Sequence, residues 1–310
     1  MSPRPRIAAS LALAAVLAGC IGSSGAARSA GSTIVARVAV GGQPCGVVGA
    51  GGNVWVSDAS SGELVRIDPG TNTVTGRFPG RPAPCEMTFA AGSIWVVTQS
   101  NRLLRVDPQS GAIQAAIPVG ATSYDVTSAF GTIWVSNRNG RTVQRINPKT
   151  NKVVKTIRMP RASPGGLVAA ASYLWVGSEL DRNLFRINPR TNRFVKVTTR
   201  QFGPTWLTAA VGSVWIANFG EDTVSRLNPR TRKVTRTIKV GVRPVNLEAD
   251  YGSIWVPLDR DNVVVRIDAA TGSLLERIPV GAGPAVVAGA GGDVWVTNFE
   301  DGSVWRISPG

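Results

Sequence analysis

One motif, Gly-x-aliphatic-Trp-Val, recurs along the chain at a nearly constant spacing and constrains the fold more than any other feature. Its tryptophans are Trp55, Trp95, Trp134, Trp175, Trp215, Trp255 and Trp295, which are 40, 39, 41, 40, 40 and 40 residues apart. A proline precedes six of them by eleven residues, and an arginine follows all seven by ten or eleven residues. Three landmarks that stay in phase seven times indicate seven copies of one structural unit.

Each copy contains the pattern of four short strands. In the first copy we expect strands at 45–50, 53–57, 63–67 and 73–78, with turns at Gly51-Gly52 and Asp68-Pro69-Gly70. No segment after the first twenty residues shows a helical apolar period. The sequence therefore predicts an all-β fold, a seven-bladed β-propeller of four-stranded antiparallel blades. A horseshoe solenoid is the alternative, but it requires capping repeats at both ends.

The two ends of the repeat region predict how the ring closes. Residues 31–310 number seven times forty, and the first strand, 32–41, resembles the fourth strand of a blade, such as 275–281. The last copy ends after its third strand. We therefore expect the N-terminal strand to complete the last blade, which removes two exposed sheet edges. Blade four has Ser172 where the other copies have glycine, so we expect its first turn to be the most strained.

The first thirty residues read as a targeting segment rather than as part of the fold. Residues 1–20 combine Arg4 and Arg6 with an apolar run that is too short to span a bilayer, and end in Leu-Ala-Gly-Cys. This ending resembles the lipobox of bacterial lipoproteins, which implies lipidation at Cys20 and a partner in the lipid bilayer. An ordinary secretory peptide with an incidental cysteine is the alternative. Residues 21–30 read as a flexible tether and 31–310 as the propeller domain, so we expect a cell-membrane lipoprotein on the extracytoplasmic side.

Charge and composition limit the possible functions. The chain has 34 Lys and Arg against 19 Asp and Glu, and no histidine, so the commonest general base and transition-metal ligand is missing. Basic residues concentrate in the third to fifth copies, and we expect them to form a basic rim that meets a cell-envelope protein or an anionic polymer. An ordinary solvated surface is the alternative. Nucleic acid is not expected as a partner, because the rim lacks interleaved aromatic residues. We expect a monomer.

The innermost strand of each copy predicts a candidate ligand site. The residues two and four positions after the proline differ between copies, and period-2 alternation turns both toward one side. In a propeller that side faces the central channel, so we expect Glu86, Asp125, Trp206, Asn246 and Glu248 near its mouth. The second-to-third strand loops open on the same face and add Asn137, Arg138, Phe219, Asp259, Arg260 and Phe299. A ligand pocket is one interpretation and a water-filled channel is the other.

Two pairs of side chains at the channel have further predicted roles. Glu86 and Asp125 lie on neighbouring copies, where they would raise one another's pKa or hold a divalent cation such as magnesium or calcium; no other cofactor is expected. Cys45 and Cys85 occupy the same position in adjacent copies, and in an oxidising compartment we expect them to form a disulfide.

The repeat segments 294–307 and 271–284 resemble the YVTN-type, YncE-like seven-bladed propellers, and also the streptogramin (virginiamycin B) lyase family. The resemblance covers residues 32–310 and implies an extracytoplasmic propeller. The YncE-like proteins have no established reaction as a class, whereas the lyases open a macrocyclic lactone with a catalytic histidine and magnesium. This chain has no histidine to match. Our first hypothesis is a membrane-anchored propeller that binds a ligand or protein partner at its top face. A carbon–oxygen lyase and a cell-envelope sensor or scaffold are the alternatives.

Overall fold

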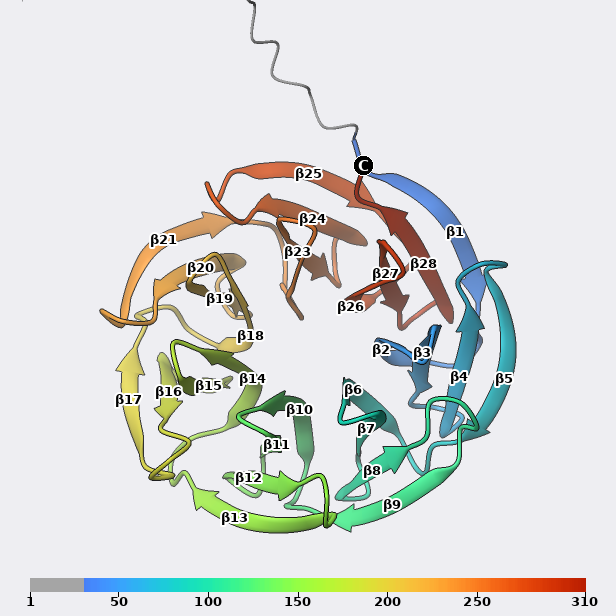
Figure 1. Ribbon diagram of the computed structural model, residues 1–310. Coiled ribbons are helices and arrows are strands. Elements are labelled where there is room, and N and C mark those ends of the chain that lie inside the picture. The colour runs from blue at the N-terminus through green and yellow to red at the C-terminus, as the bar shows by residue number, and fades with distance from the viewer. Residues whose placement is uncertain (1–30) are drawn as a thin grey trace, which may run out of the picture. The chain divides into compact units, whose positions relative to one another are not determined.

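The computed structural model describes residues 31–310. The predicted signal peptide, the lipidation site Cys20 and the tether 21–30 lie outside the described residues. The described chain forms seven antiparallel four-stranded sheets arranged as blades around a central channel (Figure 1). This confirms the seven-bladed β-propeller predicted from the repeat. No helix within residues 31–310 is long and apolar enough to cross a membrane.

The blades follow one another around the ring, and their strands run from the channel outward in chain order. Blades 1 and 2 consist of β2 (Pro44–Ala50), β3 (Asn53–Asp58), β4 (Glu63–Asp68), β5 (Thr73–Pro79), β6 (Pro84–Ala90), β7 (Ser93–Thr98), β8 (Arg102–Val106) and β9 (Ile113–Pro118). Blades 3 and 4 consist of β10 (Ser123–Ala129), β11 (Thr132–Asn137), β12 (Thr142–Asn147), β13 (Lys152–Arg158), β14 (Pro164–Ala170), β15 (Tyr173–Ser178), β16 (Asn183–Ile187) and β17 (Phe194–Thr198).

The remaining blades repeat the same order. Blades 5 and 6 consist of β18 (Pro204–Ala210), β19 (Ser213–Asn218), β20 (Thr223–Asn228), β21 (Lys233–Lys239), β22 (Glu248–Asp250), β23 (Ser253–Leu258), β24 (Val263–Asp268) and β25 (Leu274–Pro279). Blade 7 consists of β26 (Pro284–Ala290), β27 (Asp293–Asn298), β28 (Ser303–Ser308) and β1 (Thr33–Ala39). The N-terminal strand therefore completes the last blade, as the two chain ends predicted.

The ring has two faces, defined here by the turns they carry. The bottom face carries the turns that join the first strand of a blade to the second and the third to the fourth. The top face carries the second-to-third strand loops and the links between blades. Because β1 pairs antiparallel with β28, with Thr33 opposite Ser308, the described chain starts on the bottom face beside the C-terminus (Figure 1).

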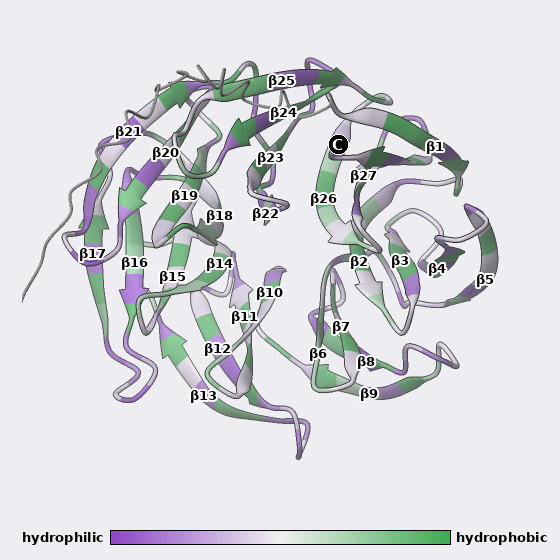
Figure 2. Cartoon of the chain, turned by 45° about the horizontal axis from the view of Figure 1, so that its top comes forward, coloured by the Kyte–Doolittle hydropathy of each residue, from purple (hydrophilic) through white to green (hydrophobic). Residues whose placement is uncertain are grey.

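The repeated tryptophans lie between blades and are fully buried. Trp55, for example, packs with Met87, Ile94 and Leu104 of the next blade. The strands on either side of each tryptophan are apolar, whereas the outermost strands alternate between hydrophobic and hydrophilic residues (Figure 2). The core is therefore divided into seven layers, one at each joint between blades. Each joint removes a large aromatic side chain from water, which contributes on the order of 2–3 kcal/mol.

The repeated arginines form the second contact at the joints. Arg105 donates from Nη1 to the carbonyl of Pro148, and Arg145 to that of Pro189, in both cases the third-to-fourth strand turn of the next blade. The same bond is made by Arg66, Arg226, Arg266 and Arg306. The guanidinium thus satisfies a turn carbonyl that no strand can pair, and it ties each blade to the next.

Blade 4 departs from this pattern in two ways. Its first turn places two non-glycine residues, Ala171 and Ser172, at positive φ of 47° and 65°. Its arginine, Arg186, lies over the ring of Tyr173 at 4.0 Å and donates no hydrogen bond to blade 5. Tyr173 occupies the position from which Ser93, Thr132 and Ser213 bind the arginine in other blades. The sequence signal at Ser172 therefore marks a blade with a weaker joint.

Blade 6 has a shortened innermost strand. β22 spans only Glu248–Asp250, although Pro244 still pairs with Leu258. The facing strand contains Pro257, which has no N–H to donate across the ladder. The interruption leaves Asn246 at the channel wall, outside regular pairing.

Candidate functional site

Two connected hollows follow the channel, one at the top face and one below it. The upper hollow, called the top pocket here, has a volume of about 510 Å³ and is lined by the upper ends of the innermost strands and the loops around them. The lower hollow, the lower channel, has a volume of about 390 Å³. Glu86 and Trp206 line both, so these two side chains separate the top pocket from the lower channel.

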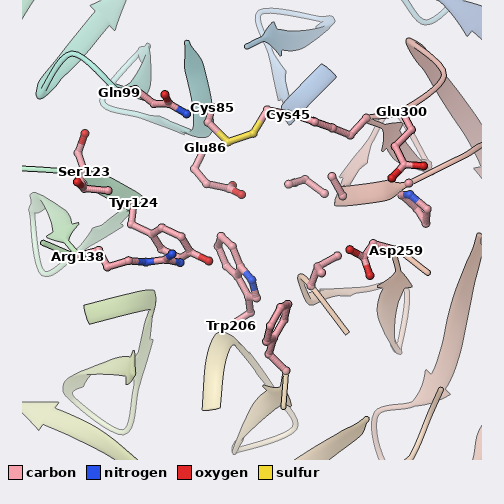
Figure 3. A pocket seen from close by; sticks show the side chains of 18 residues that line it. Cys45, Cys85, Glu86, Gln99, Ser123, Tyr124, Arg138, Trp206, Asp259 and Glu300 are labelled. Atoms are coloured by element: carbon pink, nitrogen blue, oxygen red, sulfur yellow. A yellow bond between two sulfur atoms is a disulfide. The ribbon is translucent and has the colours of Figure 1, made fainter. Parts of the chain in front are cut away.

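Glu86 forms the floor of the top pocket. Its side chain is only 7% exposed, and within residues 31–310 it has neither a hydrogen bond nor an ion pair. Burial raises the pKa of its carboxyl well above the ordinary value, and the nearby Asp125 and Glu248 carboxyls raise it further. Burial and the like charges therefore favour the protonated form of this carboxyl, which points into the pocket (Figure 3).

An aromatic stack forms one wall beside Glu86. The rings of Tyr124 and Trp206 lie 4.8 Å apart in a stacked arrangement (Figure 3). The guanidinium of Arg138 covers the other side of the Tyr124 ring at 3.8 Å and pairs with Glu179 at 2.8 Å. Burial raises the pKa of the Tyr124 hydroxyl, so it remains a neutral donor. Arg138, Tyr124 and Trp206 thus form a continuous series of contacts along this wall.

The rim opposite the stack combines phenyl rings with carboxylates. Phe219 and Phe299 line the top pocket together with Asp259 and Glu300. Arg243 pairs with Asp259 at 3.1 Å and lies over the Phe219 ring at 5.0 Å. Burial raises the pKa of Asp259, and the neighbouring arginines oppose that change. The rim therefore presents apolar surface with a partly neutralised charge at its edge.

The lower channel holds two half-buried carboxyls, Asp125 and Glu248. Asp125 accepts hydrogen bonds from the backbone N–H of Leu167 at 2.6 Å and of Val126 at 2.7 Å, which joins blade 3 to blade 4. Burial raises its pKa to about 6 even though these bonds lower it. Glu248 has a pKa raised to about 8 by burial and by Asp250. Asn246 is 8% exposed and its amide has no hydrogen-bond partner among residues 31–310.

A disulfide joins Cys45 to Cys85 at the wall of the top pocket, with their Cα atoms 4.9 Å apart (Figure 3). It connects the innermost strands of blades 1 and 2, which start side by side at the channel. Ser57 supports the same corner, donating to the carbonyl of Cys85 and accepting from the N–H of Gly46. The disulfide therefore fixes the strand that carries Glu86.

The structure brings together many of the residues that the sequence placed at the channel. Glu86, Trp206, Arg138, Phe219, Asp259 and Phe299 line the top pocket, and Asp125, Asn246 and Glu248 line the lower channel. Asn137 instead is fully buried in its blade, where its amide donates to Thr142 and Gln144. Arg260 lies outside the pocket lining and faces Glu300 at 3.9 Å on the exposed surface.

Sequence reasoning missed Tyr124, which occupies the same position in its blade as Cys45 and Cys85. A β-bulge interrupts the innermost strand just after the proline position, as between Ser123 and Asp125. Strict alternation fails there, so the residues one and two positions after the proline both face the channel. The sequence signal that could have identified Tyr124 is that tyrosine and two cysteines occur at this one position of the repeat.

Metal binding has little support in the described part of the chain. Among residues 31–310 no group of three or more His, Cys, Asp or Glu side chains is arranged to hold a metal ion. The divalent cation expected at Glu86 and Asp125 stays a prediction.

Comparisons with solved structures agree with the fold. A catalytically inactive variant of virginiamycin B lyase from Staphylococcus aureus with quinupristin has a TM-score of 0.76 and 18% identity, and the alignment covers 86% of this chain and 94% of that one. A streptogramin B lyase structure has a TM-score of 0.75 and 15% identity, covering 87% and 95% of the two chains. At this identity the likeness shows the fold alone. Comparison with curated proteins gives no match.

The fold is thus a seven-bladed propeller with a pocket at the mouth of its channel. The family model for glutamine cyclotransferase matches residues 131–293, more than half of the chain. The chain belongs to the glutamine cyclotransferase family. The match extends from blade 3 to blade 7 and leaves out Glu86 on blade 2, so the role of that carboxyl rests on the structure.

Proposed function

We propose that the top pocket binds a small amphipathic ligand and that the reaction performed there is cyclisation of an N-terminal glutamine. The observation that carries this proposal is Glu86, a buried carboxyl with a strongly raised pKa and no protein partner among residues 31–310, at the floor of an aromatic-walled pocket. The family match supports the reaction class. A volume of about 510 Å³ suits a ligand of one or two amino-acid residues.

The chemistry needs one group that both gives and takes a proton. The neutral α-amine attacks the side-chain amide carbon, a carbon–nitrogen bond forms to close a five-membered lactam, and the original amide bond breaks to release ammonia. Protonated Glu86 gives its proton to the leaving nitrogen, and the resulting carboxylate takes the proton from the attacking amine. Atoms balance without a co-reactant. A carboxyl at its ordinary pKa would be ionised at pH 7 and have no proton to give.

The walls give the substrate its orientation. Trp206, Phe219 and Phe299 offer apolar surface for the substrate's aliphatic stem and for the residue that follows it. Tyr124 presents a neutral hydroxyl whose raised pKa keeps it a hydrogen-bond donor to a carbonyl oxygen. Asp259 and Glu300 at the rim attract an N-terminal ammonium before it loses its proton.

The test is ammonia release from short peptides that begin with glutamine, measured on the full chain. We expect turnover in the wild type and a loss of at least about 100-fold in kcat for Glu86→Gln. Glu63→Gln is the matched control, because Glu63 is on the surface of blade 1 and pairs with Arg77. Wild-type turnover should also fall as the pH rises through the raised pKa of Glu86. Equal turnover in wild type and Glu86→Gln would overturn the assignment.

The same preparation separates the other candidates. Quinupristin belongs in the substrate panel because a lyase with this fold was solved with it. Linearisation of quinupristin would show that the protein catalyses a lyase reaction, and this assignment would replace glutamine cyclisation. A ligand that raises the melting temperature of the wild type without being turned over would instead indicate that the propeller binds its ligand at the top face as a binding protein, sensor or scaffold.

We also infer that the protein is a lipoprotein on the extracytoplasmic side of the cell membrane. The Leu-Ala-Gly-Cys ending at Cys20 supports this location, and so does a disulfide, which persists in oxidising compartments. Metabolic labelling with a radioactive fatty acid should mark the wild type and not Cys20→Ala. Labelling of both proteins, or of neither, would contradict lipidation at Cys20.

A further inference from the structure

The bottom face of blades 3–5 carries an uncompensated positive charge. Its third-to-fourth strand turns, together with the first residues of β13 and β21, carry seven exposed basic residues: Lys149, Lys152, Arg190, Arg193, Arg230, Arg232 and Lys233. None of the seven is within ion-pair distance of a carboxylate in residues 31–310. Apart from Asp125 inside the channel, the carboxylates of these blades are Glu179, Asp181, Glu221 and Asp222, all on top-face loops. The two faces of these blades therefore differ in charge.

The fold itself does not require this charge pattern. In blades 1, 2 and 6 the same turn begins with Asp68, Asp107 and Asp268, which accept the N–H two residues later. In blades 3, 4 and 5 it begins with Asn147, Asn188 and Asn228, which accept the equivalent N–H. Asparagine thus keeps the turn while removing the negative charge, in the three blades whose turns carry lysine and arginine.

Exposed apolar side chains lie on the same face. Phe130 and Val211 are 39% and 59% exposed, and they stand at φ of 52° and 46° in the first turns of blades 3 and 5. Blades 1 and 7 have glycine at this position, Gly51 and Gly291, where positive φ is unstrained. Positive φ is unfavourable for bulky residues and most of all for β-branched valine. Neither backbone preference nor burial accounts for these two side chains.

The apolar turns and the basic turns are neighbours. Arg145 bonds both Thr132, next to the Phe130 turn, and the carbonyl of Pro189, next to Arg190. Val211, Pro229 and Arg230 line one hollow of about 490 Å³ between blades 4 and 5. This is the joint at which Arg186 makes no bond to the next blade. The hollow combines small apolar side chains with polar groups, and one arginine, Arg230, lies at its wall.

We propose that this bottom-face patch, defined by Lys149, Arg190, Arg230, Phe130 and Val211, docks on an anionic lipid bilayer. Basic side chains attract the lipid phosphates, and the exposed apolar turns enter the boundary between headgroups and acyl chains. A soluble anionic polymer has no such apolar boundary.

The attachment point of the N-terminal segment supports the bilayer as the occupant. Gly31 and Ser32 lie on the bottom face, where Ser32 accepts a hydrogen bond from Arg266. In Figure 1, β1 lies across the ring from the outer strands β13 and β17, and β21 lies two blades away from it. Ten residues separate Cys20 from Gly31, a reach of at most about 36 Å. The chain's predicted anchor and the patch would thus hold opposite edges of one face, and the top pocket would open away from the membrane.

The test measures vesicle binding of residues 31–310, which close their ring without the preceding segment. Co-sedimentation uses vesicles of phosphatidylcholine alone and of phosphatidylcholine with 30% phosphatidylglycerol. We expect binding to the anionic vesicles, weakened by salt. Lys149→Gln/Arg190→Gln/Arg230→Gln should weaken it on the order of 100-fold. The matched control is Lys155→Gln/Lys196→Gln/Lys239→Gln, which removes the same charge from outer strands and should change binding less than about 3-fold.

A second variant separates lost binding from lost folding. Phe130→Gly/Val211→Gly relieves positive φ, so it should melt at or above the wild-type temperature, yet bind anionic vesicles about 10-fold more weakly. Equal effects of the two charge variants would overturn the proposal. A glycine variant that binds vesicles as the wild type does would also overturn the proposal, if a soluble anionic polymer such as heparin competes fully with the vesicles. Those two results together would indicate that the face binds a polymer.

Discussion

Charged side chains at the joints between blades make hydrogen bonds, whereas two carboxyls at the wall of the channel make none in the described part of the chain. At the joints, arginines are buried or half-buried and donate to turn carbonyls of the next blade, as Arg266 does to Pro309. At the channel wall, Glu86 is buried and Glu248 is half-buried, neither has a hydrogen bond or a cation within residues 31–310, and the pKa values of both carboxyls are raised. The joints stabilise the ring, whereas the channel wall costs stability.

This difference indicates where function is located. A satisfied buried charge fits a structural role, but an unsatisfied one is expensive and persists where something other than folding requires it. The internal repeat supports this interpretation, because the arginine is present in all seven blades, whereas a carboxyl stands at the position of Glu86 in two blades and at the position of Glu248 in one. Substitutions at the two regions should therefore change stability with opposite signs.

The largest expected effect on the free energy of unfolding comes from removing the disulfide, which lies at the channel wall and also joins two blades. Cys45→Ser/Cys85→Ser should lower the free energy of unfolding by about 4 kcal/mol, because the cross-link closes a loop of about 40 residues. Urea unfolding measures the change. Wild type under reducing conditions should match the double variant, and a difference of less than about 1 kcal/mol would show that the strands carry this joint alone.

Removing a carboxyl from the channel wall should raise the free energy of unfolding, whereas removing the disulfide lowers it. Between the ordinary pKa of 4.5 and the folded value of about 8, Glu248 binds more protons in the folded state than in the unfolded state. The wild type should therefore lose stability as pH rises, up to about 1.4 kcal/mol per pH unit and up to about 3 kcal/mol from pH 5.5 to 8. Glu248→Gln should be more stable than wild type at pH 8 and less pH-dependent. A variant with the wild-type slope would place the titration elsewhere.

The arginine contacts test the joints directly. Arg266→Ala should cost about 2–3 kcal/mol, because it leaves the Pro309 carbonyl without its donor and removes the cation that faces Glu276. Arg186→Ala should cost less than about 1 kcal/mol, because Arg186 donates no bond to blade 5. Thermal and urea unfolding of the two variants side by side give the comparison. Equal losses would mean that packing over Tyr173 replaces the missing hydrogen bond.

The smallest expected effect concerns the first turn of blade 4. Ser172→Gly should raise the free energy of unfolding by about 0.5–1 kcal/mol, since serine stands at φ of 65° where other blades have glycine. Differential scanning calorimetry is sensitive enough to detect it. The reverse change in blade 3, Gly131→Ser, should destabilise by a similar amount. A Ser172→Gly variant that loses stability would show that the serine hydroxyl supports the turn.

Much of the fold was predictable because the repeat is an internal alignment. The spacing of seven tryptophans determined the number of blades, and the unmatched first and last strands determined how the ring closes. The shortened β22 was not predicted. Its cause, Pro257 in the facing strand, is visible in the sequence only once the pairing partner is known.

The candidate site was predictable in part, for a physical reason. Period-2 alternation correctly turned Glu86, Trp206 and Glu248 toward the channel. It missed Tyr124 because a bulge places two consecutive residues on one side. The separate prediction that the second-to-third strand loops line the site included Asn137, which is buried in its hairpin and donates to Thr142.

The sequence by itself determined the blade, the count of blades and the strand that closes the ring, because these depend on local strand and turn chemistry repeated at a fixed period. Tertiary structure alone decided which carboxyls lose their water, which arginine lacks a partner and which turns share a face with the chain's point of attachment. Those properties depend on how blades approach one another around the ring, and desolvation and charge act through space rather than along the chain.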